Sequence, residues 1–169
     1  MYPIVLDLTR VSILLIGQGE LLEKRKKQLE EYGAAKLVVS TPAAMLQHWQ
    51  NSQVIMIAGL NRSVSETISA KARADGKLVN VEDINDLCDF YFTANVRRGE
   101  LVIAVSTSGA SPTLARKVRD RIAGYFGAEW GERVRILSDL RKSLKAGGAG
   151  MKEIIEKTET FLVEKGWLA

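Results

Sequence analysis

Short apolar runs alternate with stretches of strong helix formers along the first half of the chain. Continuous apolar runs of four to six residues are typical of buried strands, and the longer stretches between them carry Leu and Ala near helical spacing. Gly33 and Gly76 stand where two of the helices are expected to end. The pattern predicts strands at 11–16, 36–40, 54–58 and 78–81, and helices at 20–32 and 63–75. This alternation predicts a parallel sheet covered by helices on both faces.

The second half of the chain changes character after residue 100. A fifth apolar run, 101–105, leads into a hydroxyl-rich loop, 106–111, and then into a helix that we expect to end near Tyr125. Ser111 is suited to cap this helix, and Pro112 to occupy its first turn. Two further amphipathic helices are predicted at 129–145 and 151–166, joined by a glycine-rich linker. They indicate a helical subdomain appended to the α/β body.

Composition narrows the class of protein. The chain has 169 residues, of which 46% are hydrophobic and 26% charged, and it contains one cysteine. These values exclude an intrinsically disordered chain, a disulfide scaffold and a cysteine-based zinc site. No apolar run approaches the ~18 residues that span a bilayer, and the first residues do not resemble a signal peptide. We therefore expect a soluble, cytoplasmic protein that does not bind membranes.

The net charge of +4 is unevenly distributed. The segment 116–145 holds nine Lys and Arg against four Asp and Glu, a net charge of +5, so the rest of the chain is close to neutral. Such a segment suits an anionic partner, either a nucleic acid or a ligand with phosphates or several carboxylates. A solvated helix face would account for it equally well.

A glycine turn, Gly17-Gln18-Gly19, lies between the first predicted strand and helix. Glycines in this position let backbone N–H groups approach a pyrophosphate at the helix N-terminus. The third glycine of the dinucleotide-binding pattern is replaced by Leu22, and no acidic residue ends the second strand, where Ser40 and Thr41 stand. The turn is therefore compatible with a dinucleotide site or with a purely structural turn.

Two polar segments are expected at the carboxyl edge of the sheet, where open α/β sheets bind ligands. Glu82 and Asp83 follow the strand 78–81, and one of them can face the cleft as a general base or metal ligand; a polar capping loop is the alternative. The loop 106–111 can form an anion site or simply cap its helix. The single histidine, His48, and the single cysteine, Cys88, stand outside any catalytic motif, so we assign neither a catalytic role.

Several segments together resemble the dehydrogenase/ferrochelatase module of siroheme synthase and its stand-alone relatives, the precorrin-2 dehydrogenases. The resemblance runs in the same order from Tyr2 to about Lys145, and it is most specific between Asn80 and Arg116. It is carried by the segments 2–8, 13–20, 78–83, 88–90, 96–99 and 101–116.

The resemblance implies a Rossmann-like parallel sheet with an NAD-binding domain at 1–92, a dimerisation segment at 93–126 and a C-terminal helical subdomain at 127–169. It also implies NAD-dependent oxidation of precorrin-2 to sirohydrochlorin by a homodimer, with Asp83 as the catalytic residue, and iron insertion as a further activity of some members. The eight carboxylates of that substrate would suit the basic segment better than nucleic acid does. The alternative is a sirohydrochlorin ferrochelatase, or a tetrapyrrole-binding homologue, that has lost dehydrogenase activity.

The site residues that follow from the turn and the resemblance fall into two groups, and we expect no resident metal. The cofactor group is Gly17, Gln18, Gly19, Glu20, Leu21, Ser40, Thr41, Ala58 and Gly59; the substrate group is Asn80, Ser106, Thr107, Ser108, Ser111 and Arg116. The chain departs from the family pattern at its turn, at Gly59, Leu60 and Ser65, and in a shortened stretch after Pro42. All of these departures concern the cofactor side, whereas the Asp83 side is intact.

Overall fold

The computed structural model describes residues 2–168, which form two compact units divided between Phe92 and Thr93. The first unit contains β1 (Ser12–Gly17), α1 (Gly19–Glu31), β2 (Lys36–Ser40), α2 (Leu46–Trp49), β3 (Val54–Ala58), α3 (Arg62–Ala74), β4 (Leu78–Val81) and a 3₁₀ turn, η1 (Asn85–Leu87). The second contains β5 (Ala94–Arg98), β6 (Leu101–Val105), α4 (Pro112–Tyr125), α5 (Trp130–Ala146) and α6 (Met151–Lys165).

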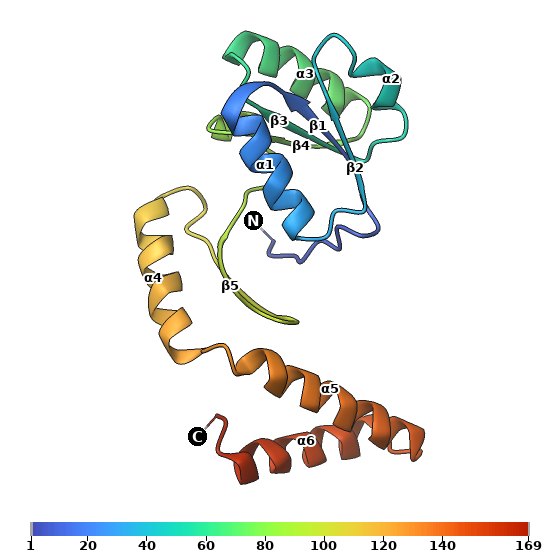
Figure 1. Ribbon diagram of the computed structural model, residues 1–169, viewed down its shortest axis with the longest axis vertical. Helices are drawn as coiled ribbons and strands as arrows, with labels where there is room; N and C mark the ends of the chain where they lie inside the picture. The colour runs from blue at the N-terminus through green and yellow to red at the C-terminus, as the bar shows by residue number, and fades with distance from the viewer. Residues whose placement is uncertain (1, 169) are drawn as a thin grey trace. The chain divides into compact units, whose positions relative to one another are not determined.

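The first unit is built on a four-stranded parallel sheet in the order β2-β1-β3-β4. The central strands are buried on both faces, because successive side chains of a strand point to opposite sides. Leu14 and Ile16 face the side covered by α2 and α3, whereas Ile13 and Leu15 face the side covered by α1 (Figure 1). The parallel sheet with helices on both faces, expected from the alternating pattern, is confirmed, and it has the Rossmann-like arrangement that the resemblance implies.

The outer edge of β4 is covered by the segment that follows it. The backbone N–H of Val79 donates to the carboxylate of Asp89 (2.9 Å), and the backbone N–H of Asp89 donates to the carbonyl of Val79 (2.8 Å). The Cys88 thiol bonds the backbone N–H and carbonyl of Val81, both at 3.2 Å. These bonds satisfy backbone N–H and carbonyl groups that an edge strand would otherwise leave without a hydrogen-bond partner. They also fix the position of the segment that follows β4.

The second unit differs from the sequence-based expectation in one respect. Leu101–Val105 does not extend the parallel sheet as a fifth strand but pairs with β5 as an antiparallel hairpin. The turn between them is Gly99-Glu100, in which Gly99 has a positive φ of 58°. A reversal this tight joins antiparallel neighbours, whereas a parallel strand needs a crossover connection of a dozen or more residues. The predicted helices 112–125, 129–145 and 151–166 are observed within one residue of their predicted ends.

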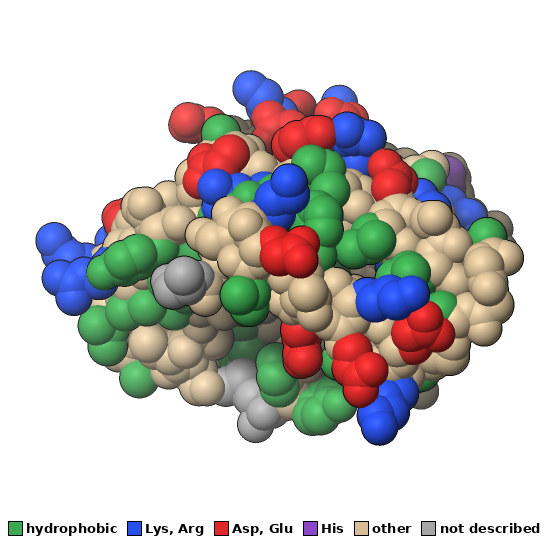
Figure 2. Space-filling view, turned by 90° about the horizontal axis from the view of Figure 1, so that it is seen from below, with side chains coloured by type: hydrophobic (Ala, Val, Ile, Leu, Met, Phe, Trp, Pro, Cys, Tyr) green, Lys and Arg blue, Asp and Glu red, His purple; other side chains and the backbone are tan. Residues whose placement is uncertain are grey.

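The helices of the second unit carry several ion pairs on their exposed surface. On α5, Arg135 bonds Glu132 (2.8 Å) and Asp139 (3.2 Å), and on α6, Lys157 pairs with Glu153 (2.6 Å). Figure 2 shows acidic and basic side chains lying next to one another on one face of the molecule, with hydrophobic side chains between them. Among residues 2–168, no helix is long and apolar enough to cross a membrane.

Candidate cofactor and active site

The chain reverses its direction across the sheet at β1, which lies between β2 and β3. Such a switch point opens a crevice at the carboxyl ends of the two strands. Here the turns after β1 and β3 pack backbone against backbone: the N–H of Gln18 donates to the carbonyl of Ala58 (3.2 Å). A Cβ on Gly17 would lie 1.8 Å from that carbonyl oxygen, and a Cβ on Gly59 would lie 2.1 Å from the carbonyl oxygen of Gln18.

The helix that follows the first turn, α1, has an N-terminus suited to an anion. Its N-cap residue, Gln18, makes no side-chain capping bond, so the N–H groups of the first turn have neither an intrahelical nor a side-chain partner. Gly19 has a φ of 72°, and the space above it is open. The free N–H groups and the helix dipole together favour a phosphate at this point. Glu20 is the opposing feature, because its exposed carboxylate lies in the same turn.

A crevice of about 300 Å³ opens beside this turn, between the ends of β1 and β2. It brings together three of the residues predicted to bind the cofactor, Gly17, Ser40 and Thr41, although Gly17 lies more than twenty residues before the other two. Leu22, in the place of the third glycine, forms part of its apolar wall and also packs into the core beside Leu29. The full lining is Gly17, Leu22, Val39, Ser40, Thr41, Ala44 and His48.

These features fit a dinucleotide. The volume and the largely apolar lining suit a nucleoside, and the adjoining N–H groups suit its pyrophosphate. Of the other predicted cofactor residues, Gln18, Glu20 and Leu21 are exposed in the turn, whereas Ala58 is buried and contributes only its backbone. Sequence reasoning missed His48, which reaches the crevice because the short helix α2 places it there; no periodicity marked that helix.

Asp83 is the second residue after β4, and its backbone has a φ of 59°. This left-handed conformation is costly for a residue with a side chain, although Asp and Asn tolerate it better than most, and strained residues of this kind cluster at functional sites. The side chain is exposed, and among the described residues it has no hydrogen bond or ion pair. Asp83 therefore presents a free carboxylate at the carboxyl edge of the sheet.

The neighbouring acid, Glu82, is engaged elsewhere. Its carboxylate accepts a hydrogen bond from Nε of Arg25 on α1 (2.9 Å), and a second from the Nη2 of the same guanidinium. The side chains of Arg25 and Glu82 are 11% and 20% exposed. The guanidinium also lies over the ring of Phe92, 3.9 Å from its centre. Of the two adjacent carboxylates after β4, only Asp83 is thus available for chemistry.

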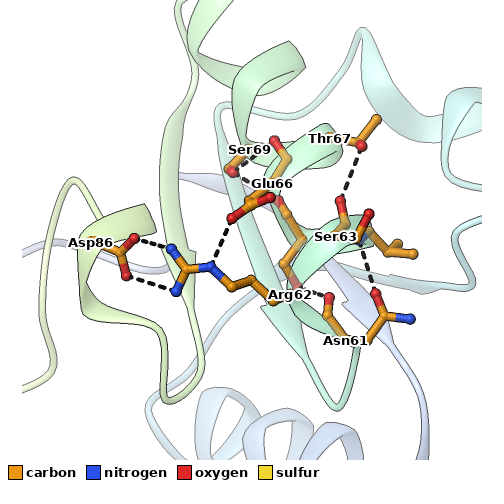
Figure 3. Close-up of polar contacts among 9 residues, drawn as sticks. Asn61, Arg62, Ser63, Glu66, Thr67, Ser69 and Asp86 are labelled. Carbon is orange, nitrogen blue, oxygen red and sulfur yellow. Dashed lines mark hydrogen bonds and ion pairs between the residues drawn. The ribbon is translucent and has the colours of Figure 1, made fainter.

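A second arginine holds the chain on the other side of Asp83. Arg62, at the start of α3, lies between Glu66 on its own helix and Asp86 in η1 (Figure 3). Its Nε bonds Glu66 at 2.7 Å, and the rest of the guanidinium bonds the carboxylate of Asp86. This hydrogen bond from Arg62 lowers the pKa of Asp86 below its ordinary value. Arg25 and Arg62 therefore fix the residues before and after Asp83.

Asn80, which we expected to bind substrate, has a different environment. It is buried in β4, and its side-chain amide donates to the carbonyl of Phe90 (2.9 Å) and contacts the Cys88 sulfur (3.6 Å). These bonds tie β4 to the segment that covers its edge, so in this structure Asn80 supports the site rather than faces a ligand. Burial raises the pKa of the Cys88 thiol, which makes it a poor nucleophile.

The hydroxyl-rich loop belongs to the second unit and is largely satisfied by its own bonds. Ser106 accepts from the N–H of Ser108 (3.1 Å), Thr107 from that of Ser111 (3.0 Å), and Ser111 from that of Leu114 (3.2 Å). The N–H groups of Ser108, Ser111 and Leu114 are therefore used locally, and the hydroxyl protons remain available to bind a ligand. Ser108 shares with Asp83 a left-handed backbone, with a φ of 55°.

The basic segment divides into paired and unpaired cations. The acids of the segment bind Arg119, Arg133, Arg135 and Lys142. On the described part of α4, Arg116, Lys117 and Arg121 are exposed and have no acidic partner. Of the five cations of the segment without an acidic partner among the described residues, three lie on α4, directly after the hydroxyl-rich loop, and two, Arg141 and Lys145, lie on α5. Among residues 2–168 no cluster of three or more His, Cys, Asp or Glu is arranged to hold a metal ion.

Two protein families match the chain, one over most of its first unit and one within its second unit. Residues 4–94 match a family described as "Putative NAD(P)-binding", and residues 98–125 match one described as "Sirohaem biosynthesis protein central". A solved structure titled SirC, precorrin-2 dehydrogenase, has the same fold with a TM-score of 0.77 at 21% identity, and the match covers 100% of this chain and 93% of that one.

The similar curated proteins are siroheme synthases. That of Methylococcus capsulatus is 32% identical over 162 residues, which cover 85% of this chain and 34% of the relative. That of Stutzerimonas stutzeri is 30% identical over 170 residues, which cover 89% of this chain and 37% of the relative. The chain therefore spans about a third of the length of these relatives.

Proposed function

Since the chain belongs to the NAD(P)-binding family that matches residues 4–94, we propose that it is a dehydrogenase that oxidises precorrin-2 to sirohydrochlorin with NAD. The observation that carries this proposal is the pairing, within one unit, of a nucleoside-sized crevice beside a free helix N-terminus with a free, strained carboxylate at the same edge of the sheet. The names of the similar siroheme synthases and of the SirC structure support the choice of substrate.

In this proposal the pyrophosphate of NAD is held by the backbone N–H groups of Gly19, Glu20 and Leu21, and the adenosine half occupies the crevice beside Ser40 and Thr41. The close packing of Gly17 and Ala58, and of Gln18 and Gly59, keeps side chains out of its path. When bound, NAD accepts the hydride. Asp83 accepts the proton that the substrate loses at the same time, so the products are sirohydrochlorin, NADH and a proton.

The substrate carries eight carboxylates, and the second unit supplies groups that would bind them. The hydroxyls of Ser106, Thr107, Ser108 and Ser111 can each donate a proton, and Arg116 presents an exposed guanidinium. Charge-assisted hydrogen bonds of this kind are stronger than neutral ones. Nothing in the chemistry of the proposed reaction calls for nucleic acid.

A second candidate is a sirohydrochlorin ferrochelatase or tetrapyrrole-binding protein without dehydrogenase activity. It is favoured by Leu22, which fills space that a third glycine would leave, and by Glu20, whose charge opposes a pyrophosphate. Asp83, exposed and unpaired, would then take protons from the macrocycle, and ferrous iron would be a substrate. The two candidates differ in whether NAD binds.

The proposal also includes a homodimer that works in the cytoplasm, where nicotinamide cofactors are available. Support for the dimer comes from large apolar side chains that the second unit leaves exposed on β6 and α4: Val102, Leu114, Val118 and Tyr125, the last 76% exposed. Exposed apolar side chains in this number are typical of an interface, and a twofold axis would pair like with like.

The decisive experiment incubates the chain with precorrin-2 and NAD and follows NADH formation and the absorbance of sirohydrochlorin. We expect turnover with the wild type and a loss of at least about 100-fold with Asp83→Asn, which removes the proton acceptor and keeps the shape. Calorimetry with NAD should show the same affinity for both proteins. Absence of NAD binding would favour the second candidate, and full activity of Asp83→Asn would overturn the assigned role of Asp83.

A further inference from the structure

We propose that the crevice between β1 and β2 binds NADP about as well as NAD, so that the protein does not distinguish the two by the 2′ substituent of the adenosine ribose. This inference rests on the proposed function, because it takes the crevice to be the place of the adenosine half. It extends that function by assigning the class of cofactor, and it names Ser40 and Thr41 as the residues whose lack of charge allows both dinucleotides to bind.

The first observation is the end of β2. A site selective for NAD places a carboxylate there, which bonds the ribose hydroxyls and repels a 2′-phosphate. In this chain β2 ends at Ser40, and Thr41 follows it. The Ser40 hydroxyl donates to the carbonyl of Thr41 (3.2 Å), and Thr41 is exposed. The end of the strand therefore carries hydroxyl groups, and it lacks the charge that would reject a phosphate.

The second observation is the charge of the surroundings. The described side chains that line the crevice include no Asp or Glu, and their single ionisable member is His48. The adjoining groove along β2, about 410 Å³ in volume, is lined by His48 and Lys36 and again by no acid. A 2′-phosphate would therefore meet neutral or basic groups only. Because the described residues that line the two spaces include no arginine to hold the phosphate in two bonds, we expect no strong preference for NADP either.

Calorimetry on the full chain with NAD and with NADP tests this inference directly. We expect dissociation constants within about threefold of one another, because a crevice without a like charge has no means of rejecting the phosphate. The variant Thr41→Asp supplies the missing carboxylate. It should weaken NADP binding by at least about tenfold more than it changes NAD binding, because a carboxylate at position 41 repels the 2′-phosphate, which NAD lacks.

The matched control is Asn51→Asp, which adds the same charge in the adjoining groove, outside the crevice. It should change the ratio of the two affinities by less than about twofold at physiological salt. If NAD binds and NADP binds more than about thirtyfold more weakly, the inference fails and the proposed function stands. If neither binds, the proposed function fails. If Thr41→Asp affects both dinucleotides alike, the adenosine half lies elsewhere and the inference is overturned.

Discussion

Gly17 ends β1 against the carbonyl of Ala58 so closely that a Cβ on residue 17 would lie 1.8 Å from the oxygen. The obstacle is backbone of the central strand β3, which cannot move aside as the end of a flexible side chain can. The absence of a side chain at position 17 is thus what allows β1 and β3 to remain neighbours up to the turn, with the crevice open beside them.

We predict that Gly17→Ala lowers the free energy of unfolding by about 2–3 kcal/mol, the usual cost of overpacking a rigid site. The matched control is Gly33→Ala, at a position with a φ of 81° and nothing within 4 Å of the added Cβ. It carries only the backbone strain of the left-handed region, about 1–2 kcal/mol. Urea denaturation with a common slope measures both variants. An equal or smaller loss for Gly17→Ala would show that the strands can separate.

The strands of the first unit could be predicted from sequence because β1 and β3 are buried on both faces and therefore form unbroken apolar runs. β5 could not, because Ala94–Arg98 alternates small, polar and charged residues and is supported by its partner in the hairpin. The same local pairing explains why β6 left the parallel sheet. An apolar run shows that a segment is a strand but not which strand lies beside it.

The candidate site was predictable to the extent that it is made by chain-adjacent residues. The turn at Gly17 and the acids after β4 could be located from their place after an apolar run. The Arg25–Glu82 pair could not, since 57 residues separate the two and many charged residues on α1 were equally plausible partners. That pair decides which of the two adjacent acids is free, so the choice of Asp83 needed the resemblance or the structure.

We predict that Asp83→Gly separates stability from activity. Glycine adopts a φ near 59° without the steric cost that Asp pays, so the variant should be more stable, by up to about 1 kcal/mol. Its turnover should fall by at least about 100-fold, since the proton acceptor is gone. Urea denaturation and the precorrin-2 assay measure the two effects. A variant that lost stability would show that the Asp83 side chain makes contacts that hold the turn.

Arg25→Met should be one of the costlier changes on the surface of α1. It leaves the Glu82 carboxylate, 20% exposed, without its two hydrogen bonds, and we expect a loss of about 1–3 kcal/mol. Adding Glu82→Gln should restore part of this loss, because no charge then remains unpaired. Arg10→Met is the control: Arg10 is 86% exposed in its pair with Asp7, so less than about 0.5 kcal/mol is expected. If the stability loss of the double variant equalled the sum of the losses of Arg25→Met and Glu82→Gln, the two side chains would not interact, which would contradict the pairing.

Asp86 should contribute to the pH dependence of stability. Its pKa lies below 3.8, chiefly because of the hydrogen bond from Arg62. A carboxyl group whose pKa is lower in the folded state stabilises it fully above the unfolded value and loses this contribution as the pH falls through the folded value. Asp86→Asn should therefore be less stable than wild type near neutral pH, and the two should converge as the pH falls below the ordinary carboxyl value of 3.8. Urea midpoints across this range measure the effect.

The control for this prediction removes the other partner. Arg62→Met takes away the hydrogen bond that lowers the pKa of Asp86, so the same convergence at acid pH is expected. In the Arg62→Met background, Asp86→Asn should have little further effect on the pH profile. A full effect of Asp86→Asn in that background would mean that another group, and not Arg62, lowers the pKa of Asp86.

Glu20 is the residue at which helix stability and cofactor binding are opposed. Its carboxylate in the first turn of α1 interacts favourably with the helix dipole, but it competes with a pyrophosphate for the same field. We predict that Glu20→Gln costs about 0.5 kcal/mol of stability and tightens NAD binding by about two- to fivefold at low salt. The gain should shrink as added salt screens the charge.

Glu30→Gln, near the other end of the same helix, removes an equal charge far from the turn and should leave the affinity unchanged. Calorimetry at two salt concentrations compares the two variants. Weaker NAD binding by Glu20→Gln would contradict the prediction, because it would mean that the carboxylate bonds the cofactor directly. Glu20 would then bond the cofactor in place of the carboxylate that NAD-selective sites have at the end of β2. Any selectivity for NAD over NADP would in that case depend on Glu20.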